Sequence, residues 1–261
     1  MVAAVAAFSI VSCKKDQTED PIIVAPDCKV TKIEYYDDNK LEETDNITYD
    51  ANGKISKIVE DKYALNFTYS ADKISSVNSD NEKVEVTLLN GRAIKSTQVG
   101  GSAYDEYTYN ADGYLSGVKY YNGGLKDTYV LSYTNNNLTN ITMTNGSYTD
   151  TYIFEYNSDL SSTNLFRINL IINQVINDFI PVEFLGKSSK NNISKVTSTT
   201  NYTSGGASYK TEGIITYTYV KDVDSKVTSA TLVEAYKDFK NSSLVGNYTY
   251  NSKYNFTYSC K

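Results

Sequence analysis

Two short stretches carry the oxygen-rich side chains that a calcium ion would need. ITYDANGKI (residues 47–55) and YTYNADGYL (residues 107–115) each place Asp and Asn side chains beside a glycine. A calcium loop of the EF-hand type also needs alternating oxygen ligands and a later bidentate glutamate, which neither stretch supplies. Asp, Asn and Gly are equally the residues that tight turns require. We therefore interpret both stretches as turns and predict neither a metal site nor a cofactor.

The chain of 261 residues contains no histidine, which limits the catalytic mechanisms that it can support. A Ser-His-Asp or Cys-His nucleophile system is therefore excluded within this chain. A glycoside hydrolase needs only two carboxylates, which can come from distant strands. The pairs Asp37–Asp38 and Glu42–Glu43 are interpreted as solvated charges of a loop and a sheet edge. We predict no catalytic residue and expect the protein not to be an enzyme; a glycan-active hydrolase is the alternative.

Tyrosine is the residue type best suited to binding here, with 25 Tyr and no Trp in the chain. Tyr35 and Tyr36 are adjacent, as are Tyr120 and Tyr121. Successive side chains of a strand point to opposite faces, so one ring of each pair is expected to face away from the core. These four residues are candidate contacts for a glycan or a surface protein. Ordinary cross-strand tyrosine pairing is the alternative interpretation.

The first of the three cysteines follows the apolar run MVAAVAAFSIVS, which is too short to span a bilayer. Residues 1–12 are interpreted as a signal peptide. The usual basic residues before its apolar core are missing, which an upstream start codon or a trimmed sequence would explain. The sequence Ile10-Val11-Ser12-Cys13 resembles a bacterial lipobox, which implies lipid attachment at Cys13. An ordinary secretory signal with an incidental cysteine is the alternative. Residues 13–27 are interpreted as the lipid-bearing cysteine followed by a polar tether.

The tether begins with Lys14-Lys15-Asp16 and continues to Glu19-Asp20. This acidic cluster approximately resembles the surface-export signal of Bacteroidota lipoproteins. We therefore expect an outer-membrane location with a lipid anchor, facing the cell exterior. The formal net charge is −6 and Lys and Arg do not cluster, so nucleic acid is not expected as a partner.

The other two cysteines, Cys28 and Cys260, stand at the two ends of the predicted folded region. In an oxidising compartment such a pair suggests a disulfide, which would place the first and last strands side by side. Two free buried thiols are the alternative.

The elements that must position these residues are predicted from a repeat. An apolar-x-Tyr triplet followed by a polar turn recurs at anchor positions 20 to 24 residues apart, namely Tyr49, Tyr69, Leu89, Tyr109, Tyr133 and Tyr156. Each unit reads as a β-hairpin with flanks that alternate apolar and polar residues. We predict one all-β domain over residues 28–261, a long antiparallel meander curved into a barrel-like sheet. Polar residues on its outward face disfavour a transmembrane barrel.

One segment does not follow this repeat pattern. Residues 162–186 carry apolar side chains at near-helical spacing, with a polar stripe of four asparagines. We predict a largely buried helix over about 163–179, around which the sheet wraps. A pair of buried strands is the alternative.

The hairpins and the late segment Leu185-Gly186-Lys187-Ser188-Ser189-Lys190-Asn191 together resemble a Bacteroidota lipoprotein family. That family is a domain of unknown function with a porin-like fold, a lipobox, Tyr-Asp-x-x-Gly hairpins and an LG-x-x-SKN segment. The resemblance covers about residues 28 to 261 and implies a barrel-like fold. It transfers no catalytic residue. The sequence thus predicts a lipid-anchored, non-catalytic binding or structural module.

Overall fold

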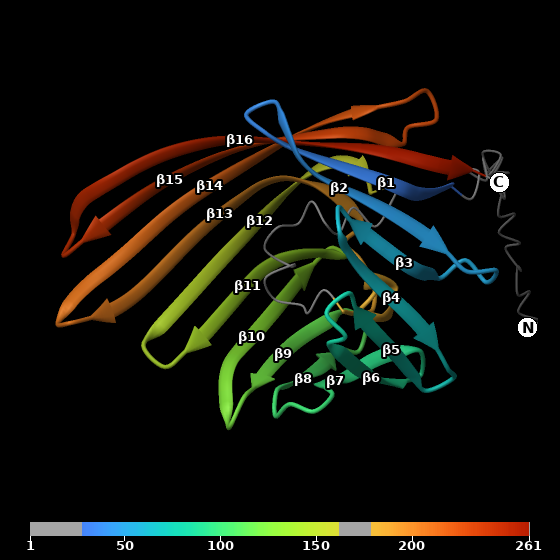
Figure 1. The fold of residues 1–261 in the computed structure, drawn as a ribbon. Coiled ribbons are helices and arrows are strands. Elements are labelled where there is room, and N and C mark those ends of the chain that lie inside the picture. Colours follow the sequence, from blue (N-terminus) through green and yellow to red (C-terminus); the bar gives the residue numbers. More distant parts are fainter. Residues whose placement is uncertain (1–27, 162–178, 261) are drawn as a thin grey trace, which may run out of the picture.

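The computed structural model describes residues 28–161 and 179–260. These residues form a closed barrel of sixteen strands, in which every strand pairs antiparallel with its neighbours along the chain and β1 pairs with β16 (Figure 1). The strands are β1 (Cys28–Asp37), β2 (Lys40–Tyr49), β3 (Ile55–Glu60), β4 (Tyr63–Tyr69), β5 (Lys73–Asn78), β6 (Lys83–Leu89), β7 (Arg92–Gln98), β8 (Tyr104–Tyr109), β9 (Leu115–Tyr121), β10 (Leu125–Thr134), β11 (Asn137–Asn145), β12 (Tyr148–Leu160), β13 (Asn191–Ser204), β14 (Ala207–Lys221), β15 (Val227–Lys240) and β16 (Ser243–Cys260). The all-β prediction is confirmed, and the sheet is fully closed.

The predicted helix over about 163–179 lies outside the described residues except for Phe179, which is in a turn. Among the described residues the only helical element is the 3-10 helix η2 (Val182–Phe184). The structure therefore provides no support for the helix. In the described ranges no helix is long and apolar enough to cross a bilayer.

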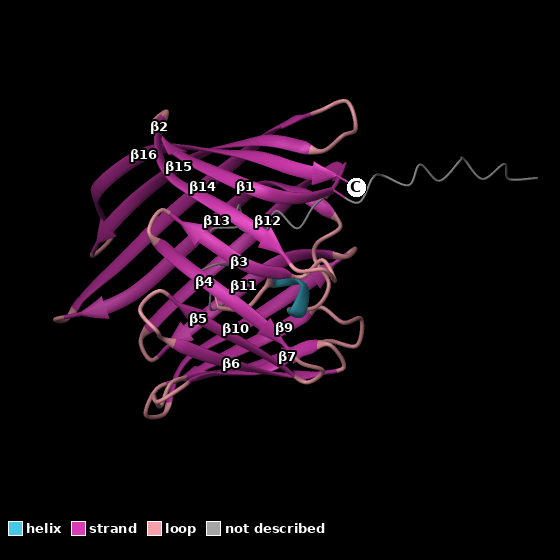
Figure 2. Ribbon diagram, turned by 45° about the vertical axis from the view of Figure 1, so that its right-hand side comes forward, coloured by secondary structure: helices cyan, strands magenta, loops and turns pink. Residues whose placement is uncertain are grey.

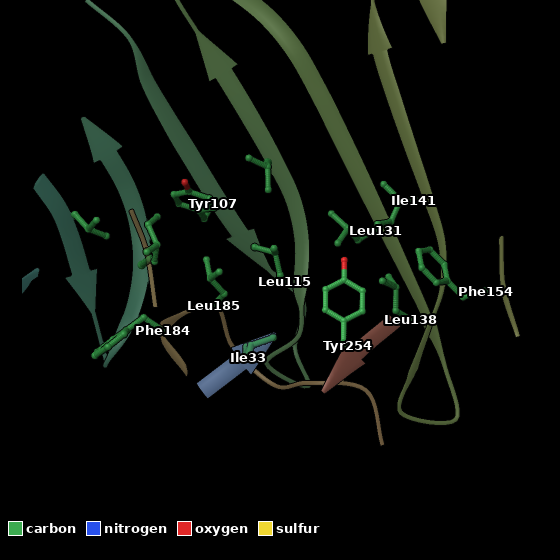
Figure 3. Close-up of a cluster of buried hydrophobic side chains, with 14 of the residues drawn as sticks. Ile33, Tyr107, Leu115, Leu131, Leu138, Ile141, Phe154, Phe184, Leu185 and Tyr254 are labelled. Atoms are coloured by element: carbon green, nitrogen blue, oxygen red, sulfur yellow. The ribbon is translucent and has the colours of Figure 1, made fainter. Parts of the chain in front are cut away.

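The wall follows from the alternation in the sequence. In β4, Leu65 and Phe67 are buried while Asn66 and Thr68 are exposed, and the same period of two recurs around the barrel. The inward apolar side chains form one core, whose most deeply buried members include Ile74, Val86, Ile141, Val196 and Leu232. Figure 3 shows part of this core.

The two ends of the barrel differ. We call the end that holds Cys28 and Cys260 the proximal end; the turns after the even-numbered strands also lie there. The opposite, distal end carries the turns after the odd-numbered strands. Strands β3 to β9 have six or seven residues, whereas β13 to β16 have 14 to 18. The long strands consequently project away from the C-terminus as one tall side of the wall (Figure 1).

The two stretches that resembled calcium loops are proximal turns. The Asp50 carboxylate accepts hydrogen bonds from the backbone N–H groups of Asn52 and Lys54, both at 2.9 Å. Gly53 supplies the positive φ of 78° that this turn requires. In the second stretch, the Asn110 side chain accepts from the backbone of Tyr114. The side chains of Asp50 and Asn110 are thus engaged in their own turns.

Candidate functional site

Four of the five tyrosines of the predicted repeat, all except Tyr133, form a ring at the proximal end together with two further tyrosines. Each stands at or near the end of an even-numbered strand, and its hydroxyl donates to a backbone carbonyl of the preceding strand at 2.5 to 2.7 Å. The pairs are Tyr49–Val30, Tyr69–Ile55, Tyr109–Ala93, Tyr156–Leu138, Tyr219–Ile193 and Tyr258–Val227. The ring extends past the predicted repeat to β14 and β16. We call it the tyrosine rim, and its role is structural.

Cations cover several rings of the rim. The Lys29 ammonium lies 5.1 Å from the Tyr49 ring centroid, and Lys54 lies 4.9 Å from that of Tyr69. The Arg92 guanidinium lies 5.5 Å from the Tyr109 ring. Such contacts stabilise modestly at exposed sites and also screen the aromatic faces from water.

A strap of residues 179–191 closes the barrel inside this rim. Phe184 stacks on Tyr69 with ring centroids 5.6 Å apart, and Tyr109 donates to the Phe184 carbonyl. The Ser189 hydroxyl accepts from the backbone of Leu138. Figure 2 shows η2 among the proximal turns, and Figure 3 shows Phe184 and Leu185 among the core side chains. The LG-x-x-SKN segment is therefore part of a plug.

Toward the distal end, the side chains that line the inner wall change from the aliphatic residues of the core to tyrosines and carboxylates. The Glu234 carboxylate accepts from the Tyr236 hydroxyl at 2.7 Å and from the Ser252 hydroxyl at 3.4 Å. Burial and the adjacent Glu234 both raise the pKa of Tyr236. Ser252 in turn contacts the Tyr35 hydroxyl, and Tyr35 packs on Tyr254.

Three further carboxylates meet on β2 and β3. Oxygens of Glu43, Asp45 and Glu60 all lie within 4.8 Å of one another, and each residue has an additional interaction partner. Glu43 was expected to be a solvated charge at a sheet edge. That expectation is wrong, because the closed barrel has no edge at β2 and the residue opposite Glu43 is the inward-facing Tyr35.

The four candidate tyrosines do not form one site. Tyr35 faces the interior as described, and its neighbour Tyr36 belongs to the outward alternation. Tyr120 lines a pocket of about 200 Å³ with Asp105 and Ser96. Tyr121 stacks on Tyr104 with centroids 4.5 Å apart. The two pairs are on β1 and β9, eight strands apart around the wall.

The pocket beside Tyr120 is polar at its base. The Ser96 hydroxyl donates to Asp105 at 2.7 Å and lies 3.1 Å from the Tyr107 hydroxyl. Burial raises the pKa of Tyr107 well above its ordinary value, and the nearby Asp105 carboxylate adds to this. The phenol is therefore neutral at physiological pH and serves as a hydrogen-bonding group.

A larger cleft lies among the distal hairpin tips of the long strands. It has a volume of about 540 Å³, and we call it the distal cleft. Its lining residues are Ser147, Thr149, Asn201, Tyr202, Thr203, Ser208, Tyr209, Lys210, Glu212, Phe239 and Ser242. None of them was among the sequence candidates. The available signal was symmetry: Tyr202 and Tyr209 flank the Gly205–Gly206 turn at equal distance, so a tight hairpin must place them opposite each other.

The two remaining sequence expectations differ in outcome. The disulfide between Cys28 and Cys260 is present and joins residues 232 positions apart. It holds β1 against β16 where the barrel closes, as expected from the sequence. Cys13 and the tether lie outside the described residues, so lipid attachment stays a prediction.

Comparisons with known proteins support the fold alone. No family model matches the chain, and no curated protein matches its sequence. Among solved structures, the chain is similar to a porin-like protein from Bacteroides uniformis ATCC 8492, with a TM-score of 0.64 and 18% sequence identity. The similarity covers 88% of this chain and 98% of that one. The chain therefore has a porin-like β-barrel fold.

Proposed function

We propose that the protein is a non-catalytic, water-exposed barrel on a lipid tether, whose distal end binds a ligand or partner outside the membrane. The observation that carries this proposal is the series of ion pairs on the outer wall. Around the barrel, outward side chains form ion pairs such as Lys32–Glu34, Lys195–Glu155 and the two-lysine contact of Glu85 with Lys73 and Lys83.

Such a wall is costly in lipid. A lysine facing the middle of a bilayer destabilises a transmembrane barrel by roughly 2–4 kcal/mol. Strands that cross a bilayer also need about 9–11 residues, more than the six or seven of β3 to β9. The wall is suited to water instead, and a membrane attachment would then have to come from Cys13.

The difference between the two ends of the barrel supports an orientation in which the distal end points away from the membrane. Residues 13–27 precede Cys28, so a lipid tether would leave the barrel at the proximal end, which the strap and tyrosine rim close. The distal cleft and the long hairpins lie at the opposite end. A tethered barrel would therefore hold its concave, tyrosine-rich surfaces away from the anchor.

The experiment is a comparison of two secreted forms in the native host. In one, residues 1–12 and Cys13 are kept; in the other, they are replaced by a cleavable secretory leader without a cysteine at the junction. The first form should fractionate with membranes, and the second should be released as a folded, detergent-free protein with an oxidised disulfide. A second form that stays in the outer membrane would overturn the proposal in favour of a transmembrane barrel.

The alternative of a glycan-active hydrolase rests on one observation, the grouping of Glu43, Asp45 and Glu60 within 4.8 Å. Retaining glycosidases hold two carboxyl groups about 5–5.5 Å apart. Neither the distal cleft nor the pocket at Tyr120 is lined by any of the three residues. Release of reducing sugar by the wild type, abolished in Glu43→Gln, would favour the enzyme over the binding module.

A further inference from the structure

We propose that the inner face of strands β12 to β15 binds a linear polyamine, whose ammonium groups pair with carboxylates and whose methylene chain packs against tyrosine rings. The residues concerned are Asp150, Tyr152, Glu234, Tyr236 and Asp238, which we call the acidic inner wall. The inference rests on the proposed function and names the ligand class of the barrel interior toward the distal end. It is carried by the charges of this wall, by two buried polar atoms without a hydrogen bond, and by the spacing of its carboxylates.

All five side chains face the interior of the barrel. In β15 they continue the alternation that starts from the fully buried Leu232, whereas the residues between them are exposed on the outer face. In β12, Asp150 and Tyr152 continue the alternation of the buried Phe154. The three members in β15 keep part of their surface accessible although they point inward. A ligand inside the barrel can therefore reach them.

Strands β13 and β14 place small side chains between the two halves of the acidic inner wall. The strand register forms two inward rows, Asp150–Thr200–Thr211–Asp238 and Tyr152–Ser198–Gly213–Tyr236. A Cβ added to Gly213 would lie 2.6 Å from Cε1 of Tyr236, so this ring lies over the glycine. The side chains of the intervening strands are thus too short to cover the tyrosine rings.

Among the described residues, the three carboxylates of the acidic inner wall bond only to neutral groups. Asp150 accepts a hydrogen bond from the Tyr152 hydroxyl at 3.3 Å, and Asp238 accepts one from the Thr211 hydroxyl at 2.7 Å. Glu234 likewise accepts from two hydroxyls, as described above. No ion pair within the described ranges includes any of the three. Their negative charges are therefore not compensated by protein cations.

The outer face of the same strands is different. Glu155 of β12 pairs with Lys195 at 2.7 Å, and Glu212 of β14 pairs with Lys210. Carboxylates that face water on the outside are thus neutralised by lysines, whereas those that face the interior are not. Such an arrangement gives the interior a negative potential, which attracts a ligand with several positive charges.

Two buried polar atoms of described residues lie in this region without a hydrogen bond. Asp150 is 6% exposed, and its Oδ1 atom accepts no hydrogen bond. Tyr217 is also 6% exposed, and its hydroxyl has no partner. Burial, the neighbouring Tyr219 and the Glu234 carboxylate raise the pKa of Tyr217, so its neutral hydroxyl lies within electrostatic reach of Glu234. Buried polar atoms normally have a partner, and the N–H groups of an ammonium ligand could supply one to both oxygens.

The spacing of the carboxylates favours an extended cation over a metal ion. Asp150 and Asp238 are in one row on β12 and β15, three strand spacings or roughly 14 Å apart along the wall. Glu234 and Asp238 are four residues apart in one strand, or roughly 13 Å. A calcium ion needs its oxygen ligands at about 2.3–2.6 Å, so these groups cannot converge on one ion. A chain of ammonium groups and methylenes can span them, and tyrosine rings interact favourably with both kinds of group.

The test titrates spermidine, a linear polyamine, by calorimetry into the folded protein released from its leader, as described above. Asp150→Asn, Glu234→Gln and Asp238→Asn each remove one negative charge and retain the shape of the side chain. Each should weaken binding about tenfold. Glu155→Gln is the matched control, because it removes a carboxylate from the outer face of β12. It should leave the affinity within about twofold, since solvent screens that charge. Calcium chloride is titrated in parallel.

Circular dichroism and disulfide content establish that each variant is folded, and the three inner variants test the proposal independently of one another. Saturable spermidine binding that the inner variants weaken and Glu155→Gln retains supports the inference. Absence of saturable spermidine binding by the wild type overturns it. Equal weakening by Glu155→Gln also overturns it, because only net charge would then matter. Calcium binding in place of spermidine binding, with the same dependence on the inner carboxylates, would overturn it in favour of a metal site. In each overturning case a released, folded barrel would leave the proposed function intact, with another ligand or partner.

Discussion

The hydroxyl of Tyr69 donates a hydrogen bond to the backbone carbonyl of Ile55, 2.5 Å away. The two residues are 14 positions apart and end and begin adjoining strands, so the bond fastens the end of β4 to the start of β3. The same arrangement recurs in five other hairpins of the rim. The repeated tyrosine of the sequence therefore joins the two strands of a hairpin at its open end, and it is also a core side chain.

Removing only the hydroxyl group of Tyr69 should show how much this hydrogen bond contributes to the stability of the barrel. Tyr69→Phe retains the ring that contacts Phe184 and Lys54 but leaves the Ile55 carbonyl without its donor, at an expected cost of about 1–3 kcal/mol. Urea unfolding of the released protein measures the loss of unfolding free energy. Tyr250→Phe is the control, because 47% of Tyr250 is exposed and its change should fall within about 0.5 kcal/mol. Equal effects of the two substitutions would contradict the assigned role.

Closure of the proximal end depends on Gly186 in the strap. Its φ is +88°, and a Cβ there would lie 2.6 Å from the Gly113 carbonyl oxygen. Gly186→Ala should therefore destabilise the barrel by roughly 1–3 kcal/mol, from backbone strain together with the clash. Gly91→Ala separates the two causes, because Gly91 has a similar φ of +74° and no atom near its missing Cβ. Denaturant unfolding should show the larger loss for Gly186→Ala; the reverse order would contradict the role of the strap.

The sequence predicted those features that depend on local chemistry. Alternation of apolar and polar residues locates the strands, and the Asp50–Gly53 turn is specified by its own residues. The positions of Cys28 and Cys260 at the two ends of the folded region predicted that the first and last strands meet where the barrel closes. The tyrosine rim could be predicted from the sequence only in part. The repeat marks Tyr109, for example, as a core-facing residue, but its hydrogen bond to the Ala93 carbonyl depends on the register between strands.

The candidate site was less predictable, because it depends on residues brought together by register and by strand length. Tyr202 and Tyr209 are unremarkable one at a time and become a stacked pair only when the Gly205–Gly206 turn sets them opposite each other. Adjacent tyrosines such as Tyr120 and Tyr121 were more conspicuous in the sequence. The period of two sends such neighbours to opposite faces, so they cannot share a site.

Burial of the tyrosine rim predicts a loss of stability at high pH. Burial raises the pKa of Tyr49 and of Tyr156 to about 12, from 10.0. The folded barrel therefore favours the neutral phenols. Their contribution to stability is fully present below pH 10 and is lost as the pH rises through about 12. Tyrosinate absorbance followed during alkaline titration should rise together with the loss of circular dichroism. Ionisation of all tyrosines near pH 10 in a barrel that remains folded would contradict this prediction.

Lipid attachment is predicted at a single residue, Cys13. Metabolic labelling with a palmitate analogue should mark the wild type and leave Cys13→Ala unlabelled, because the other two cysteines are held in the disulfide. The double variant Cys28→Ser with Cys260→Ser is the control and should label as the wild type does. Equal labelling of wild type and Cys13→Ala would end the lipoprotein interpretation.

The disulfide should be the largest single contributor to stability that one variant can remove. It closes a loop across a sequence separation of 232 residues. In the chain-entropy account such a long loop implies about 5 kcal/mol, since the cross-link mainly restricts the unfolded chain. The variant with Cys28→Ser and Cys260→Ser should therefore unfold at a markedly lower urea concentration. The wild type measured in reductant should follow it, because both lack the same bond. Since β1 and β16 remain paired through their backbones, the reduced barrel should stay closed in the absence of denaturant. A midpoint unchanged by reduction would show that the closing strands are held by the ladder alone.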